Sequence, residues 1–148
     1  MELTTAGLDW SKSLMYSIHQ THFLVEKHLE QKLTKARGIS FSQFLILLPL
    51  HCNKSASQTE VAHFLHLTEA TVSRHISGMA KELLITSKED SKNRRKNILE
   101  LTKKGKTAFD NAHSVIEKEL ETIFAIVPQS DRQNISHTFE AILKKLTV

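Results

Sequence analysis

Apolar residues along this chain recur mainly three and four positions apart, a spacing that predicts amphipathic helices. The first such stretch runs from about Leu8 to Lys35 without a Pro or Gly, and Gly38 ends it. Its apolar stripe consists of Leu14, Ile18, Val25, Leu29 and Leu33. A helix of this length extends beyond a small core, so it requires a partner along part of its length.

A second, more apolar helix is predicted to follow. Ser40 and Gln43 form a capping-box pattern at its start, in which each side chain accepts a bond from the other's backbone amide. The side chains from Phe44 to Leu48 are all apolar, which predicts that this helix lies at the centre of the fold. Pro49 disfavours a helical conformation at Leu48, so we expect the helix to end or kink there and residues 53–56 to form a loop.

Two short helices joined by a tight turn are predicted between Ser57 and Leu83. Ser57 and Glu60 make another capping box, His66 lies in the turn, and Thr68 is a favoured N-cap residue for the second helix, residues 68–83. The apolar stripe of the second helix consists of Val72, Ile76, Met79 and Leu83. The opposite stripe is small, hydroxylic or cationic and consists of Ala70, Thr71, Ser73, Arg74, Ser77 and Lys81. Such a helix suits the major groove of DNA, although an ordinary helical hairpin with a solvated face has the same pattern.

Residues 85–101 are predicted to form two strands around a polar tip, and Thr102 then begins another helix. The chain of 148 residues has a net charge of +4, but residues 87–106 contain eight basic and three acidic residues, a net charge of +5. The rest of the chain, with 12 basic and 13 acidic residues, has a net charge of −1. Positive charge placed directly after a helix-turn-helix indicates phosphate binding rather than only a solvated surface.

The C-terminal part predicts two more amphipathic helices. The first runs from Thr102 to about Ile126 and ends at Val127 and Pro128. Its apolar seam consists of Phe109, Ala112, Ile116, Leu120, Ile123 and Val127. The second begins with a capping box at residues 130–133 and has an apolar face of Ile135, Phe139, Ile142 and Leu146. Because the terminal helices cannot all cover their stripes on one small domain, we expect a two-fold homodimer; packing within one protomer is the alternative.

The helix-turn-helix and the basic hairpin together resemble the MarR family of bacterial transcriptional regulators. The resemblance rests on residues 57–62 (SQTEVA), 67–76 (LTEATVSRHI), 90–95 (DSKNRR) and 101–105 (LTKKG). Three positions depart from the family pattern. His66 stands where the family usually has Gly, Leu83 stands where it often has Gly, and Asn93 stands where it has an Asp that orients the wing arginine. A His in the turn carries a cost if the backbone there needs a positive φ.

The resemblance implies a mainly α fold with a small β wing, in which 1–148 is a single MarR-like domain. Residues 40–101 would be the winged-helix DNA-binding core, and residues 1–37 and 103–148 would be dimerisation helices. In the family the arginine that corresponds to Arg95 enters a minor groove of double-stranded DNA, and two-fold symmetry implies a pseudo-palindromic site. The expected DNA-contacting residues are Ser57, Gln58, Thr68, Ala70, Thr71, Ser73, Arg74, Ser77, Lys81, Lys92, Asn93, Arg94, Arg95 and Lys96.

The resemblance also implies regulation by a small-molecule effector, often a lipophilic anion, bound between the terminal helices and the winged helix. The residues expected to line that site are Trp10, His19, His22, Phe44, Leu48 and His113. A metal- or redox-sensing regulator is the alternative. The nine histidines form at most pairs, short of the four ligands of a structural zinc, and the single cysteine, Cys52, follows a buried helix, where an inert packed thiol is the common case.

No catalytic motif accompanies these features. The sequence has no nucleophile elbow, Walker loop or glycine-rich dinucleotide loop, and we expect neither enzyme activity nor a cofactor or metal. The longest apolar run, from Phe44 to Leu50, is far too short for a membrane span, and the N-terminus lacks a signal-peptide pattern. Taken together with these features, the family resemblance implies a cytoplasmic, ligand-responsive, homodimeric repressor. A winged-helix module that binds proteins instead of DNA is the alternative from another class.

Overall fold

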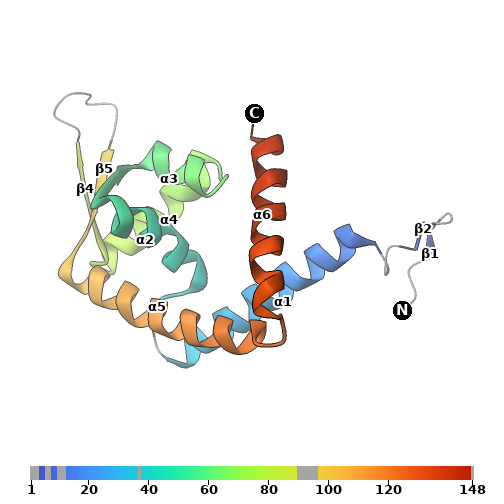
Figure 1. Cartoon of the computed structure of the whole chain (residues 1–148). Coiled ribbons are helices and arrows are strands. Elements are labelled where there is room, and N and C mark those ends of the chain that lie inside the picture. The colour runs from blue at the N-terminus through green and yellow to red at the C-terminus, as the bar shows by residue number, and fades with distance from the viewer. Residues whose placement is uncertain (1–3, 6–7, 10–12, 37, 90–96, 148) are drawn as a thin grey trace. The chain divides into compact units, whose positions relative to one another are not determined.

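The computed structural model describes residues 4–5, 8–9, 13–36, 38–89 and 97–147, and Figure 1 shows its elements. Those residues form β1 (Thr4–Thr5), β2 (Leu8–Asp9), α1 (Leu14–Lys35), α2 (Phe41–Asn53), β3 (Ser55–Ser57), α3 (Gln58–Phe64), α4 (Glu69–Lys81), β4 (Ile85–Glu89), β5 (Asn97–Leu101), α5 (Lys103–Phe124) and α6 (Gln129–Leu146). The chain divides into two compact units, residues 1–116 and 117–148, and each is described by itself.

The helix α1 begins at Leu14, so the predicted start at Leu8 is wrong. Leu8 belongs instead to β2, which pairs with β1 in antiparallel register. Ser13 sets the start of the helix, because its hydroxyl accepts a hydrogen bond from the amide of Tyr16 at 3.0 Å. Only the last part of the predicted apolar stripe is in the core: Leu29 and Leu33 are buried, whereas Leu14 is exposed.

The predicted capping box at the start of α2 is confirmed, whereas an end at Pro49, one of the two outcomes predicted there, is wrong. Ser40 and Gln43 satisfy each other's backbone amides, as the pattern required. The helix then continues past Pro49 to Asn53. A proline inside a helix costs about 3 kcal/mol, whereas burying one large apolar side chain contributes about 1.5–3 kcal/mol. The burial of Ile46, Leu47 and Leu50 around the proline therefore exceeds its cost.

The helix-turn-helix has the predicted caps at Ser57 and Thr68. His66, between α3 and α4, has a φ of 52°, in the left-handed region where the family pattern has Gly. Leu83 was predicted to share the apolar stripe of α4, and this is wrong. The helix ends at Lys81, Leu83 has a φ of 60°, and its side chain is 67% exposed. The chain turns there because the amides of Leu83 and Leu84 bond back to the carbonyls of Ala80 and Met79.

The predicted hairpin of β4 and β5 is confirmed, and β3 adds a third strand that the sequence analysis assigned to a loop. The sheet order is β3–β5–β4 with both pairings antiparallel, so β5 lies in the middle. Ala56 on β3 pairs with Leu99 on β5, and both are buried. Figure 1 shows β4 and β5 side by side after α4. A helix-turn-helix followed by such a sheet is a winged helix.

The predicted seam of α5 continues into the second unit with decreasing burial. Phe109, Ala112 and Ile116 are buried, whereas Leu120 and Ile123 are half-buried. The helix ends at Phe124, two residues before the predicted end.

The capping box predicted at Ser130 is wrong. The amides of Asp131 and Arg132 both donate to the carbonyl of Pro128, at 2.9 and 3.2 Å, so the first turn of α6 forms before Ser130 can cap it. No residue of α6 is buried. Among the described residues, no helix is both long and apolar enough to cross a membrane.

Candidate nucleic-acid interface

The helix α4 has one buried face and one exposed polar face. Val72, Ile76 and Met79 hold the buried face in the core. The other face carries the predicted contact residues, of which Ala70, Arg74, Ser77 and Lys81 are exposed and Thr71 and Ser73 are half-buried. The structure therefore brings these six predicted residues together on one surface of one helix, where small and cationic side chains permit close approach to a polyanion.

The hydroxyl groups at the start of α4 are oriented by hydrogen bonds. The Thr68 Oγ1 accepts from the amide of Thr71 at 3.2 Å and lies 2.9 Å from the Thr71 Oγ1. The Gln58 side chain reaches from α3 to the carbonyl of Glu69 at 3.2 Å. Gln58 and Thr68 thus lie at the N-terminal end of α4, which carries a partial positive charge that favours phosphate.

Ser57 is buried, whereas the predicted contacts on α4 are exposed or half-buried. It is 3% exposed, its hydroxyl accepts from the amide of Glu60, and its own amide donates to the Glu60 carboxylate at 2.6 Å. The hydroxyl and the amide of Ser57 are therefore both hydrogen-bonded within the protein. This burial argues against the predicted DNA contact, and we assign Ser57 the structural role of capping α3.

The DNA contacts predicted in the wing fall outside the described residues. The predicted contacts Lys92, Asn93, Arg94, Arg95 and Lys96 lie outside the described residues, as does the predicted ligand-site residue Trp10. Lys88 on β4 pairs across the strands with Glu100 on β5 at 3.5 Å, and both side chains are largely exposed. A pair of this kind aligns the two strands more than it stabilises them.

Two of the predicted ligand-site residues meet in an aromatic cluster of the first unit. The rings of Phe44 on α2 and His113 on α5 lie 6.3 Å apart, and both stack on Phe109, at 4.9 and 5.8 Å. His51 stacks on the same Phe109 ring at 4.2 Å. Sequence reasoning missed His51 and Phe109 as members of this cluster. Phe109 was assigned to the seam, and His51 lies beyond the residue where α2 was expected to end.

The other predicted ligand-site residues are not part of this cluster. His19 is exposed on α1, and His22, also exposed, pairs with Glu26 at 3.5 Å. Leu48 is half-buried. Within the described ranges, no three His, Cys, Asp or Glu side chains gather as metal ligands. Cys52 is exposed in the last turn of α2, so the prediction of a packed thiol is wrong.

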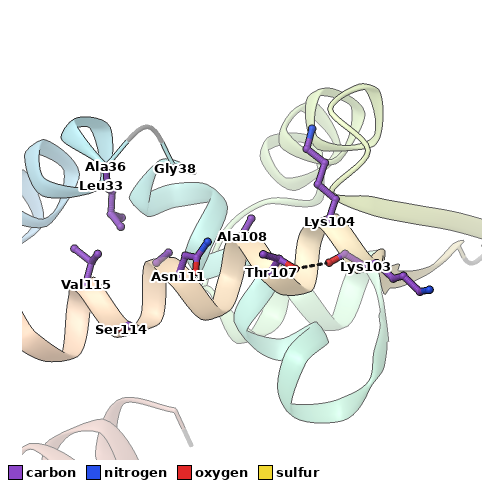
Figure 2. Close-up of a pocket in the computed structure, with 11 residues that line it drawn as sticks. Leu33, Ala36, Gly38, Lys103, Lys104, Thr107, Ala108, Asn111, Ser114 and Val115 are labelled. Atoms are coloured by element: carbon purple, nitrogen blue, oxygen red, sulfur yellow. Dashed lines mark hydrogen bonds between the residues drawn. The ribbon is translucent and has the colours of Figure 1, made fainter.

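A groove of about 740 Å³ lies between the end of α1 and the first half of α5. Figure 2 shows Leu33 and Val115 pointing toward each other across it. Asn111 and Ser114 add polar groups, while Lys104 contributes to one end. This groove and the aromatic cluster involve different residues, and the sequence analysis predicted none of the residues that line the groove.

Residues 39–96 match the family model described as "MarR family". The chain contains a MarR-family domain. MarR-family proteins are transcriptional regulators, and the match covers α2, β3, α3, α4 and β4. No curated protein matches the sequence.

Solved structures of MarR-family proteins have the same fold along nearly the whole chain. A cysteine-to-serine mutant of MarR from E. coli, complexed with operator DNA, has a TM-score of 0.84 at 14% identity, covering 94% of this chain and 99% of that chain. The transcriptional regulator BldR from Sulfolobus solfataricus has a TM-score of 0.81 at 21% identity, covering 95% and 99%. PcaV from Streptomyces coelicolor, in complex with its natural ligand, has a TM-score of 0.77 at 15% identity, covering 95% and 98%.

Proposed function

We propose that this MarR-family protein binds double-stranded DNA as a homodimer and represses transcription until a small-molecule effector releases it. The observation that carries the DNA-binding part is the geometry of α4. Its apolar residues are buried, and the exposed side presents Thr71, Ser73 and Arg74 near the N-terminal end. Hydroxyl and guanidinium groups on the first turns of such a helix can reach base edges and phosphates in a major groove.

The charge distribution supports the same proposal. Residues 87–106 hold a net charge of +5 in a chain of net charge +4, and the segment begins directly after the helix-turn-helix. On the proposed function, the basic wing residues led by Arg95 follow the neighbouring backbone and minor groove. The narrow grooves of A·T tracts concentrate negative potential, so Arg95 would favour such sequences.

The dimer part of the proposal rests on apolar side chains that remain exposed in the single chain. In the second unit, α6 exposes Ile135, Phe139, Ile142 and Leu146, and a groove of about 530 Å³ lies between this helix and the end of α5. In the first unit, α1 exposes Leu14, Met15, Phe23 and Leu24. Apolar surface gathered on whole helix faces marks a protein interface, and a second copy is the partner that two-fold DNA sites require.

The effector part rests on the aromatic cluster around Phe109. Phe44, His51, Phe109 and His113 join α2, next to the helix-turn-helix, with α5. PcaV is solved with its natural ligand, which shows that a protein of this fold can bind one. A ligand held between α2 and α5 would favour one spacing of the recognition helices over another, which is the coupling that regulation needs.

The test is binding of the purified chain to a fluorescent duplex that carries its own promoter region, titrated across salt concentrations. We expect nanomolar affinity, dimer stoichiometry and a steep dependence of log K on log salt. Arg74→Ala should weaken binding, and Lys27→Ala on α1 is the matched loss of one charge away from α4. Absence of binding at every salt concentration would reject the DNA-binding function and favour the protein-interaction module.

A further inference from the structure

Glu82 lies at the C-terminal cap of α4 and is bonded by two other helices. Its carboxylate Oε2 accepts a hydrogen bond from the Gln43 Nε2 of α2 at 2.9 Å, across 39 positions of sequence. Its main-chain oxygen accepts from the Lys104 Nζ of α5 at 2.7 Å. The end of the proposed recognition helix is therefore attached on one side to α2 and on the other to α5.

The Gln43 side chain is itself held in place. Its Oε1 accepts from the amide of Ser40 at 2.9 Å, so the two ends of the side-chain amide are both bonded. The next amide, that of Phe41, donates to the Glu30 Oε2 of α1 at 2.6 Å. A continuous set of directional bonds thus runs from α1 through the start of α2 to the end of α4.

These bonds fix the position of the C-terminal end of α4 by direction, in addition to the apolar packing of the helix. Val72, Ile76 and Met79 hold the helix by apolar packing, which is non-directional. A helix of 13 residues is about 20 Å long, so a sideways shift of about 3 Å at its C-terminal end tilts the whole helix by roughly 10°. The base-contacting groups proposed above are carried by this helix, and a tilt misaligns their hydrogen bonds to the bases, which weakens them.

We propose that Glu82 is a positioning residue for α4, which sets discrimination between the operator and other DNA through its bond to Gln43. This inference rests on the proposed DNA-binding function. A carboxylate close to a DNA-binding helix repels phosphate, so electrostatics alone would make Glu82 unfavourable for binding. Glu82 therefore favours DNA binding only by orienting α4. This effect opposes the repulsion between its carboxylate and the phosphates.

Substitutions of Glu82 separate the two effects. Glu82→Gln removes the charge but keeps an oxygen that can accept from Gln43, whereas Glu82→Ala removes both. The measurement is the ratio of affinities for the promoter duplex and for a random duplex of the same length and salt. We expect Glu82→Gln to keep the wild-type ratio and Glu82→Ala to lower it about threefold to tenfold. Gln43→Met, which removes the partner and changes no charge, should lower the ratio by a similar factor.

The ratio is insensitive to a loss of folded protein, because both affinities come from the same sample. If Glu82→Ala and Glu82→Gln tighten binding to both duplexes equally and keep the ratio, Glu82 acts only through its charge and the inference is wrong. If Gln43→Met keeps the wild-type ratio, the bond between Gln43 and Glu82 has no positioning role. A wild-type chain that binds neither duplex would reject the proposed function and this inference together.

Discussion

Gly105 on α5 lies directly against the main-chain carbonyl of Leu84, so closely that a Cβ at position 105 would be 1.9 Å from the Leu84 oxygen. The approach is reinforced at Thr102, whose hydroxyl donates to the carbonyl of Leu83 at 2.6 Å and whose amide donates to that of Leu84 at 3.1 Å. The start of α5 thus caps the turn that follows α4. Backbone, not a flexible side chain, would have to move to admit any other residue at 105.

Gly105→Ala should therefore lower the free energy of unfolding by about 3 kcal/mol, the upper end of what overpacking costs. Gly78→Ala is the matched control. Gly78 lies inside α4 with nothing within 4 Å of its Cβ position, so this change should raise stability by about 0.5–1 kcal/mol. Urea unfolding followed by circular dichroism measures both. Equal effects of the two substitutions would show that the close approach to Leu84 does not exist in solution.

His66 and Leu83 have left-handed backbone conformations, with φ of 52° and 60°. A residue with a Cβ is destabilised by roughly 1–2 kcal/mol in the left-handed region, and glycine avoids this cost. Glycine in turn loses about 0.5–1 kcal/mol because its unfolded state has more conformational entropy. His66→Gly and Leu83→Gly should each raise the midpoint of thermal unfolding, by an amount that corresponds to about 0.5 kcal/mol. Ala at the same two positions keeps the Cβ and should give no such increase.

These two positions also show how far local pattern predicts the fold. His66 and Leu83 stand where the family pattern has glycine, and both have the positive φ that glycine would favour. Helical periodicity also predicted Leu83 on the buried stripe of α4. That prediction was wrong because periodicity does not indicate where a helix ends. The backbone bonds from Leu83 and Leu84 end the helix first and leave Leu83 exposed.

Two features of the fold depend on long-range contacts and were not predicted from the sequence. The strand β3 has only Ser, Ala and Ser, and it exists because Ala56 pairs with Leu99 more than forty positions away. The continuation of α2 through Pro49 likewise depends on burial that only the assembled core supplies. In the candidate site, the residues of α4 followed from helical spacing, whereas the bond between Gln43 and Glu82 followed from no local pattern.

The buried cap at Ser57 permits a test that separates stability from DNA binding. Ser57→Ala removes the hydroxyl that accepts from the Glu60 amide, and loss of an N-cap costs about 1 kcal/mol. Because Ser57 is buried, the affinity of the folded variant for the promoter duplex at fixed salt should be unchanged. Ser13→Ala, at the start of α1, is the control that removes an N-cap hydroxyl from a helix outside the helix-turn-helix. A loss of DNA affinity at fixed salt in Ser57→Ala alone, measured where both variants are folded, would restore Ser57 to the DNA contacts.

The proposed dimer predicts that opposite faces of α6 respond differently to the same new charge. Phe139 lies among exposed apolar residues, with Ile135 and Ile142 at spacings of four and three, whereas His137 lies on the opposite side of the helix. Phe139→Glu places a carboxylate in the proposed interface, where an unpaired charge is costly to bury, so it should shift the protein to monomers in sedimentation equilibrium. His137→Glu should leave the dimer intact. If Phe139→Glu stays dimeric at micromolar concentration, the α6 face is not the interface, and the exposed α1 residues become the next region to test.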